Sequence, residues 1–145
     1  MSREFAEDLP YFKTSKQAPD TWLNKAAAEV EKAGGEILSE AFGSSGKEQA
    51  FMLRFRVGGQ TYRMVWPVAE SKYEYKPKEL RVFAQAARRQ AATMLYHDVK
   101  ACCVKARALG FEVAFFAHLE LRGGKVASEM IGATGSLPKL LKGSK

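Results

Sequence analysis

The sequence predicts an α+β fold: a small antiparallel sheet of three or more strands, with two helices packed on one of its faces. The expected element order is helix, three strands, helix, and the second helix is long. Two stretches of alternating apolar and polar residues flank Gly58-Gly59, a pattern typical of a β-hairpin. A helical pattern free of internal glycine and proline covers residues 78–109. A chain of 145 residues fits one domain.

The first helix is expected over residues 20–33. Pro19-Asp20-Thr21 is a start signal in which Asp20 can act as the N-cap, because its side chain can accept from free backbone N–H groups. Gly34-Gly35 ends the helix, since glycine tolerates the left-handed conformation there. A short strand at about residues 36–42 and a Gly/Ser-rich loop at residues 43–46 follow.

The central hairpin is the clearest pattern in the chain. If Gly58-Gly59 forms the turn, Val57 lies opposite Gln60, and counting back from this pair sets the register. The facing pairs are then Phe55 and Tyr62, Leu53 and Met64, and Phe51 and Trp66. All six side chains share one face, and a shift of one residue would move them to the other face. We therefore expect this face to cover the core.

The second helix, residues 78–109, would be ~48 Å long, which is longer than a small sheet can cover. We expect part of it to overhang or to pack on a second copy, so a homodimer is plausible. An apolar stripe follows the helical period through Leu80, Phe83, Ala87, Ala91, Met94, Val99, Cys102, Ala106 and Leu109. The opposite face is expected to carry Arg81, Gln85, Arg88, Tyr96, Lys100, Cys103 and Arg107.

Three regions are expected along the chain: an irregular N-terminal arm (1–19), one α+β domain (20–132) and a basic flexible tail (133–145). Leu9, Tyr11 and Phe12 of the arm could pack onto the body or onto a partner. Residues 111–119 are apolar and read either as a strand or as a short helix after Gly110.

The net charge of +7 is unevenly distributed. Residues 1–46 contain five basic and eight acidic side chains, whereas residues 47–145 contain eighteen and eight. Such a basic excess is typical of proteins that bind a polyanion, although it also occurs in proteins that do not.

The polar face of the hairpin places Arg54 opposite Arg63, with Arg56 diagonal to it. Like charges facing each other destabilise a sheet. Three alternatives would offset the repulsion between these arginines: solvation, a carboxylate from another element, or a phosphate ligand.

A loop and helix continue the basic character, and two tyrosines lie within the basic run. Nucleic-acid binding needs cations for the phosphates and aromatic rings for the bases. The candidate binding residues are Arg54, Arg56, Arg63, Lys72, Tyr73, Tyr75, Lys76, Lys78, Arg81 and Arg88.

Catalytic patterns are weak. Cys102 and Cys103 are adjacent, so a disulfide between them would be strained, and zinc-type cysteine spacing is absent. His97 and His118 match no nucleophile or metal motif, and no phosphate-binding glycine motif is present. We therefore expect no enzyme, metal or cofactor; a metal-dependent nuclease is the enzymatic alternative.

Two resemblances bear on this interpretation. The element order resembles that of double-stranded-RNA-binding domains, in which lysines at the start of the last helix grip phosphates, and Lys76 and Lys78 match that place. The tight turn at Gly58-Gly59, the missing loop motif and the longer last helix depart from that family, so the resemblance concerns topology.

Residues 78–127 resemble small phage and prophage proteins of unassigned function. In these proteins an Ala/Arg-rich helix precedes a pattern like F-E-x-x-F-L-x-H-L-x-L-P-D-G-R-T-V, and residues 111–127 here read FEVAFFAHLELRGGKVA. Arg122-Gly123 replaces the Pro-Asp of the pattern, so the turn chemistry differs. The resemblance implies a mobile-element origin, a short helix within residues 111–119, and no catalytic residues.

Together these features predict a non-enzymatic phage-type accessory protein that binds nucleic acid through a basic sheet and helix surface. The alternative is an anti-defence inhibitor or adaptor that blocks a host nuclease or a CRISPR-like complex, with its basic surface on an acidic protein partner. No apolar run approaches the ~20 residues of a membrane span, and the N-terminus lacks a signal-like stretch. We therefore expect no membrane partner and a cytoplasmic location in a bacterial host.

Overall fold

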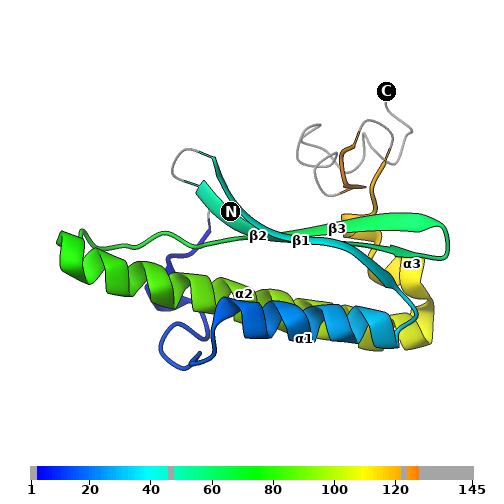
Figure 1. Ribbon diagram of the computed structural model, residues 1–145, viewed down its shortest axis with the longest axis horizontal. Helices are drawn as coiled ribbons and strands as arrows, with labels where there is room; N and C mark the ends of the chain where they lie inside the picture. Colours follow the sequence, from blue (N-terminus) through cyan, green and yellow to red (C-terminus); the bar gives the residue numbers. More distant parts are fainter. Residues whose placement is uncertain (1–2, 46–47, 122–123, 128–145) are drawn as a thin grey trace.

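A computed structural model describes residues 3–45, 48–121 and 124–127, and it confirms the α+β fold and the predicted element order (Figure 1). A three-stranded antiparallel sheet lies on one side, and two helices pack against one of its faces. The helices are α1 (Pro19–Lys32) and α2 (Pro77–Leu109), and the strands are β1 (Glu36–Ser45), β2 (Glu48–Val57) and β3 (Gln60–Pro67). The expected tail at residues 133–145 lies outside the described residues.

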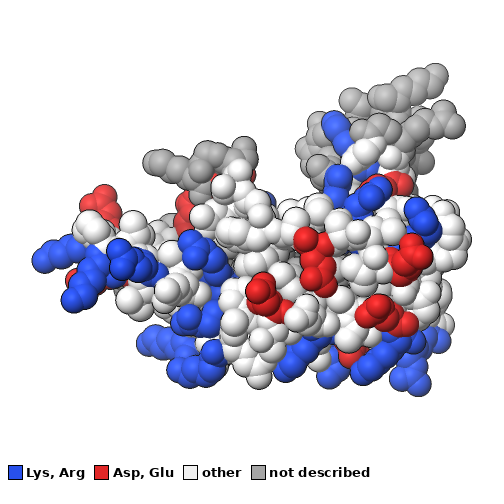
Figure 2. Space-filling view, in the orientation of Figure 1, with Lys and Arg blue, Asp and Glu red and all other residues white. Residues whose placement is uncertain are grey.

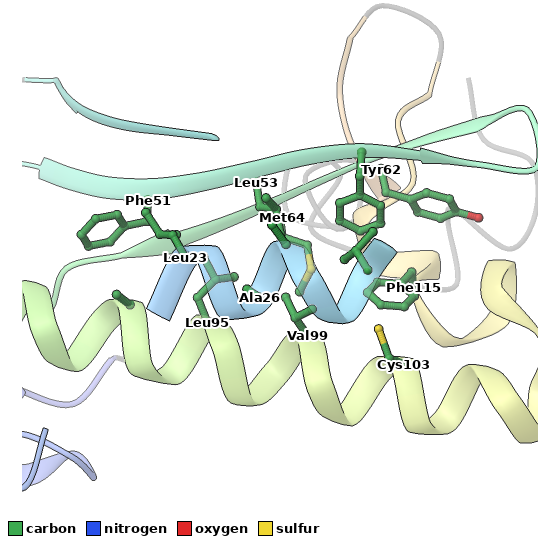
Figure 3. Packing of buried hydrophobic residues seen from close by; sticks show 14 of the residues in the cluster. Leu23, Ala26, Phe51, Leu53, Tyr62, Met64, Leu95, Val99, Cys103 and Phe115 are labelled. Atoms are coloured by element: carbon green, nitrogen blue, oxygen red, sulfur yellow. The ribbon is translucent and has the colours of Figure 1, made fainter. Parts of the chain in front are cut away.

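The hairpin register is as predicted. In β2 and β3 the facing pairs are Val57 with Gln60, Phe55 with Tyr62, Leu53 with Met64 and Phe51 with Trp66. Five of these inward side chains are buried, and Trp66 packs partly buried at the edge of the cluster. The matched alternation of the two strands therefore supplies the sheet side of the core (Figure 3).

The expected loop at residues 43–46 is wrong for its first three residues. Strand β1 continues through Gly43 to Ser45, and these residues pair with the start of β2. The composition suggested a loop, but the backbone pairing with β2 holds this stretch extended. The register of β1 shifts once, between Ile37 and Ser39, which is the signature of a β-bulge.

Helix α1 begins one residue earlier than expected, at Pro19, with Ala18 as the N-cap. The prediction that Asp20 is the N-cap is therefore wrong. Proline is favoured at the first helical position because it has no N–H to leave unpaired. Asp20 lies in the first turn instead, where its negative charge interacts favourably with the positive end of the helix dipole.

Helix α2 has 33 residues and is therefore about 50 Å long. Most of its first ten residues are exposed, including Leu80 and Val82, and Figure 1 shows this end extending past α1. The predicted overhang is thus present. The second-copy alternative stays a prediction.

The predicted stripe of α2 is confirmed at Ala87, Ala91 and Val99, which are buried, but the buried face departs from it elsewhere. The buried face follows a row of every fourth residue through Ala87, Ala91, Leu95, Val99 and Cys103. Cys103 is buried, so the prediction that it lies on the opposite face is wrong. Cys102 and Ala106 of the predicted stripe pack partly buried at the margin of the core, because the most buried line follows an i+4 ridge.

Residues 111–118 are helical, as the phage-type pattern implied. They form α3 (Phe111–Ala114) and the 3-10 turn η2 (Phe116–His118). Phe115 between them is fully buried and stacks on Phe111 with ring centroids 4.3 Å apart. The chain then reaches the edge of β3, where Leu119 forms a β-bridge with Tyr62.

The N-terminal arm is irregular apart from the 3-10 turn η1 (Ala6–Asp8), and it packs on α2. The buried Gln90 side-chain amide donates to the carbonyl oxygens of Ala6 and Pro10, at 2.9 Å each. The rings of Tyr11 and Phe12 contact His97 and Phe83 of α2. Of the two alternatives for these aromatic residues, the structure shows packing onto the body.

Candidate nucleic-acid interface

The sheet arginines lie on the face opposite the helices, and Arg54 faces Arg63 as predicted. A carboxylate from another element offsets this repulsion. The Nε and Nη2 atoms of Arg54 donate to the two oxygens of Glu120, at 2.7 and 3.2 Å. The hydrogen bond from Arg54 is the main reason that the pKa of Glu120 is lowered.

The two neighbouring arginines also contact protein groups. Arg63 donates to the carbonyl oxygen of Gly124 at 2.8 Å, and Arg56 lies 3.7 Å from Glu36 in an exposed ion pair. A phosphate ligand is not needed to explain the facing arginines. The carboxylate alternative accounts for them, and it also fixes the segment that carries Glu120 and Gly124 to the sheet.

The basic loop before α2 is held by two acidic residues of the N-terminal arm. Glu7 accepts from the hydroxyls of Ser71 and Tyr75, at 2.6 and 2.8 Å, and from the backbone N–H of Lys72 at 3.1 Å. Burial alone would raise the pKa of Glu7, but these hydrogen bonds lower it overall. The ammonium group of Lys72 lies 2.6 Å from Asp8.

These contacts divide the candidate tyrosines into two kinds. The Tyr75 ring stacks on Phe83 at 5.2 Å, and the bond to Glu7 is the main cause of its raised pKa. Tyr75 therefore has a structural position. Tyr73 is 58% exposed, so part of its ring is open to a stacked base, although the Lys72 ammonium lies 5.5 Å from the ring centroid and Tyr75 meets the ring at 6.2 Å.

The remaining candidates lie on the overhanging part of α2. Residues 76–89 contain five basic side chains and one acidic side chain. Lys78, Arg81, Gln85 and Arg88 follow the helical period and so share one face over ~15 Å. Within the described part of the chain, no carboxylate forms an ion pair with Lys76, Lys78 or Arg81, which are all exposed. We call Lys76, Lys78, Arg81, Gln85 and Arg88 the α2 basic face.

The two groups of cations are separated in space. Figure 2 shows Lys and Arg gathered at the free end of α2 and along the helix side of the molecule, with another group above the sheet. Acidic side chains lie between these groups on the face shown. The single continuous positive surface expected from the sequence is therefore interrupted on this face.

An apolar groove of about 1170 Å³ lies beside the outer face of the sheet. Its wall includes Ala41, Met52 and Val65, together with Phe5 of the N-terminal arm. Antiparallel sheets usually present polar residues on a solvent-facing side. This half of the outer face is instead apolar, and Glu4, Glu48 and Glu70 lie in the wall of the groove.

The cysteines and histidines have structural surroundings. Burial raises the pKa of both thiols to about 11, which keeps them protonated near neutral pH. Asp98 lies 3.8 Å from the Cys102 sulfur and 3.8 Å from Nε2 of His118. Across the described ranges no cluster of three or more His, Cys, Asp or Glu side chains could hold a metal ion.

Three acidic residues that organise the site were not assigned a role from sequence: Glu7, Asp8 and Glu120. The facing arginines did signal that some carboxylate was needed. The partner of Arg54 is 66 residues away in the chain, and no local pattern identifies it.

None of the described helices is long and apolar enough to cross a membrane. No protein-family model matches the chain, and no curated protein or solved structure matches it either. The resemblance of residues 78–127 to phage proteins therefore stays a prediction.

Proposed function

We propose that the protein is a non-enzymatic accessory protein that binds nucleic acid through the α2 basic face and the exposed ring of Tyr73. The observation that carries this proposal is the set of exposed cations at the overhanging end of α2, which form no ion pair with a described carboxylate. Unneutralised cations at this spacing bind phosphates by releasing condensed counterions.

The dimensions of the basic face fit a nucleic-acid backbone. A face of ~15 Å covers about four phosphates of one strand at 3.4 Å per phosphate along a duplex axis. An α-helix also fits a DNA major groove, which is about 12 Å wide. The sheet arginines contribute less to binding, because their protein contacts would have to be replaced by phosphates.

The test is fluorescence anisotropy with labelled single-stranded DNA, double-stranded DNA and RNA, from 50 to 300 mM salt. Lys78→Ala with Arg81→Ala removes two phosphate contacts, so the slope of log K against log salt should fall by about 2 for duplex DNA. Lys100→Ala with Arg107→Ala is the matched control, since it removes one lysine and one arginine from the other half of α2, both exposed. It should leave the slope nearly unchanged.

Arg54→Ala combined with Glu120→Ala removes the ion pair on the sheet without changing the net charge. We expect this double variant to bind with the affinity of the wild type. An equal loss of affinity in the Lys78/Arg81 variant and in its Lys100/Arg107 control would show that any positive surface of the protein attracts nucleic acid equally well. Binding that disappears by ~0.15 M salt would show the same. Cleavage of any of the three substrates with magnesium, manganese or zinc would refute the non-enzymatic part of the proposal.

The apolar groove favours a second candidate function, that of a protein-binding inhibitor or adaptor. Its wall is largely apolar and carries three glutamates and one arginine, Arg3, and this net negative charge suits an extended partner segment that carries both apolar and basic side chains. A solvent-facing apolar surface of this kind is typical of interaction sites.

This alternative predicts one partner that survives nuclease treatment of a bacterial lysate. The purified partner should bind the wild-type protein directly, and Val65→Glu, at a side chain that is 49% exposed, should weaken that binding at least tenfold. Thr61→Glu, on the same face of β3 but outside the groove, is the control. Equal binding by Val65→Glu and the wild type would exclude the groove as the interface.

A further inference from the structure

A small pocket of about 260 Å³ lies where the N-terminus of α1 meets the side of α2. Its wall consists of Lys16, Ala18, Pro19, Gln85, Arg88 and Arg89. Three of these six residues are basic and none is acidic. Two of them, Gln85 and Arg88, also belong to the α2 basic face, so the pocket lies at the end of that face.

The arginines of the pocket are held in place. The Nε atom of Arg89 donates to the carbonyl oxygen of Ser15 at 3.3 Å, and the guanidinium carbon of Arg88 lies 5.8 Å from the centroid of the Phe42 ring. The Nε–H of Arg88 is buried and has no hydrogen-bond partner among the described residues. A buried donor without an acceptor is costly, and the positive charge of the Arg88 guanidinium still adds to that of Lys16 and Arg89 in the same pocket wall.

The N-terminus of α1 adds backbone donors to the same place. Ala18 is the N-cap and offers no side-chain oxygen to the first turn. Pro19 has no N–H, and the Thr21 N–H donates to the Ala18 carbonyl oxygen at 3.0 Å, so the Asp20 N–H is the donor of this turn that a ligand could use. Asp20 is exposed and is not part of the pocket wall. The positive end of the dipole of this 14-residue helix therefore adds to the positive potential of the three basic side chains.

We infer that this pocket binds a phosphate monoester, namely the terminal phosphate of a nucleic-acid strand that lies along the α2 basic face. A terminal phosphate carries about −1.5 to −2 charges at neutral pH, whereas an internal diester carries one. Three basic residues in one pocket wall therefore favour the more highly charged terminal group. Ala18 and Pro19 form part of the pocket wall, so the strand would end there.

This inference rests on the proposed function, and its test separates the two. Anisotropy is measured at 100 mM salt with one single-stranded DNA sequence that carries a 5′-phosphate, a 3′-phosphate or hydroxyl groups at both ends. Binding of pyrophosphate and inorganic phosphate is measured by calorimetry. We expect one phosphorylated end to bind at least tenfold more tightly than the hydroxyl form.

Lys16→Ala with Arg89→Gln should abolish this preference for a phosphorylated end. Lys13→Ala with Lys100→Ala is the control, because both lysines are exposed and lie outside the pocket, and it should retain the preference. Equal affinity for phosphorylated and hydroxyl ends would overturn the inference and leave the proposed function standing. Pyrophosphate binding that needs Lys16 and Arg89, without binding of any oligonucleotide, would support the pocket and overturn the proposed function.

Discussion

Phe115 is one of the side chains that tie the C-terminal part of the described chain to the sheet, and Phe115→Ala tests this role. Its ring is fully buried. It stacks on Phe111 at 4.3 Å and meets the edges of Phe55 and Tyr62 at 5.5 and 6.0 Å. Removing it opens a cavity among three aromatic rings that belong to β2, β3 and α3.

The size of the effect follows from this environment. Truncation of a fully buried phenylalanine costs about 3–5 kcal/mol, and each lost aromatic pair contributes about 0.5–1.5 kcal/mol beyond the buried area. The pair terms overlap with the cavity term, so we expect a loss of ~4 kcal/mol. At an m-value of about 2 kcal/mol per molar urea, the unfolding midpoint would fall by ~2 M.

The assay is urea unfolding followed by circular dichroism and by tryptophan fluorescence, because coincident curves test two-state behaviour. Phe116→Ala is the matched control: the neighbouring ring is 49% exposed, so its loss should stay within about 0.5 kcal/mol. Equal losses of unfolding free energy for the two variants, or a loss below about 1 kcal/mol for Phe115→Ala, would refute the anchoring role.

Four further predictions follow. Burial lowers the pKa of His118 despite the nearby Asp98, so the folded state binds this proton less readily than the unfolded state. The free energy of unfolding should therefore fall as pH drops below about 6.5, and His118→Asn should weaken the pH dependence of the urea midpoint in that range. Because burial raises the pKa of both thiols to about 11, a thiol reagent should label native protein slowly at pH 7.5 and unfolded protein quickly. Gly35→Ala should lower the free energy of unfolding by about 1–3 kcal/mol, because its Cβ would lie 2.5 Å from Val30 Cγ1, whereas Gly43→Ala meets no atom within 4 Å. The predicted homodimer should give about twice the 16.1 kDa chain mass in light scattering; a single-chain mass at 100 μM would exclude it.

The fold was predictable where one local pattern decides the structure. The register of β2 and β3 follows from the alternation around Gly58-Gly59, since a slip by one residue would bury Arg54 and expose Phe55. The phase of α2 was not predictable to one residue. Its buried face is rich in alanine, and small side chains occur on several sides of the helix, so only the partner helix decides which of Cys102 and Cys103 turns inward.

The candidate site was less predictable, because pairing between distant charges decides it. Every candidate cation is recognisable as a cation in the sequence, but only tertiary structure shows which of them already has a partner. Arg54 and Lys72 have carboxylates that lie 66 and 64 residues away in the chain. The sequence of the loop between β3 and α2 suggests a site that combines stacking with charge. In the structure, however, the Tyr75 hydroxyl donates to Glu7 of the N-terminal arm, so this ring has a structural position.

The carboxylates also determine where a ligand can bind without rearranging the fold. A phosphate on the sheet would have to displace Glu120 from Arg54. Glu120 belongs to a short segment that also contacts the sheet through Leu119 and Gly124. Binding there would therefore compete with the docking of that segment. The α2 basic face carries no such competition, because Lys78 and Arg81 hold no described element in place. A phosphate that binds at Lys78 or Arg81 would displace no described protein group, and for this reason we place the proposed interface at the overhanging end of α2.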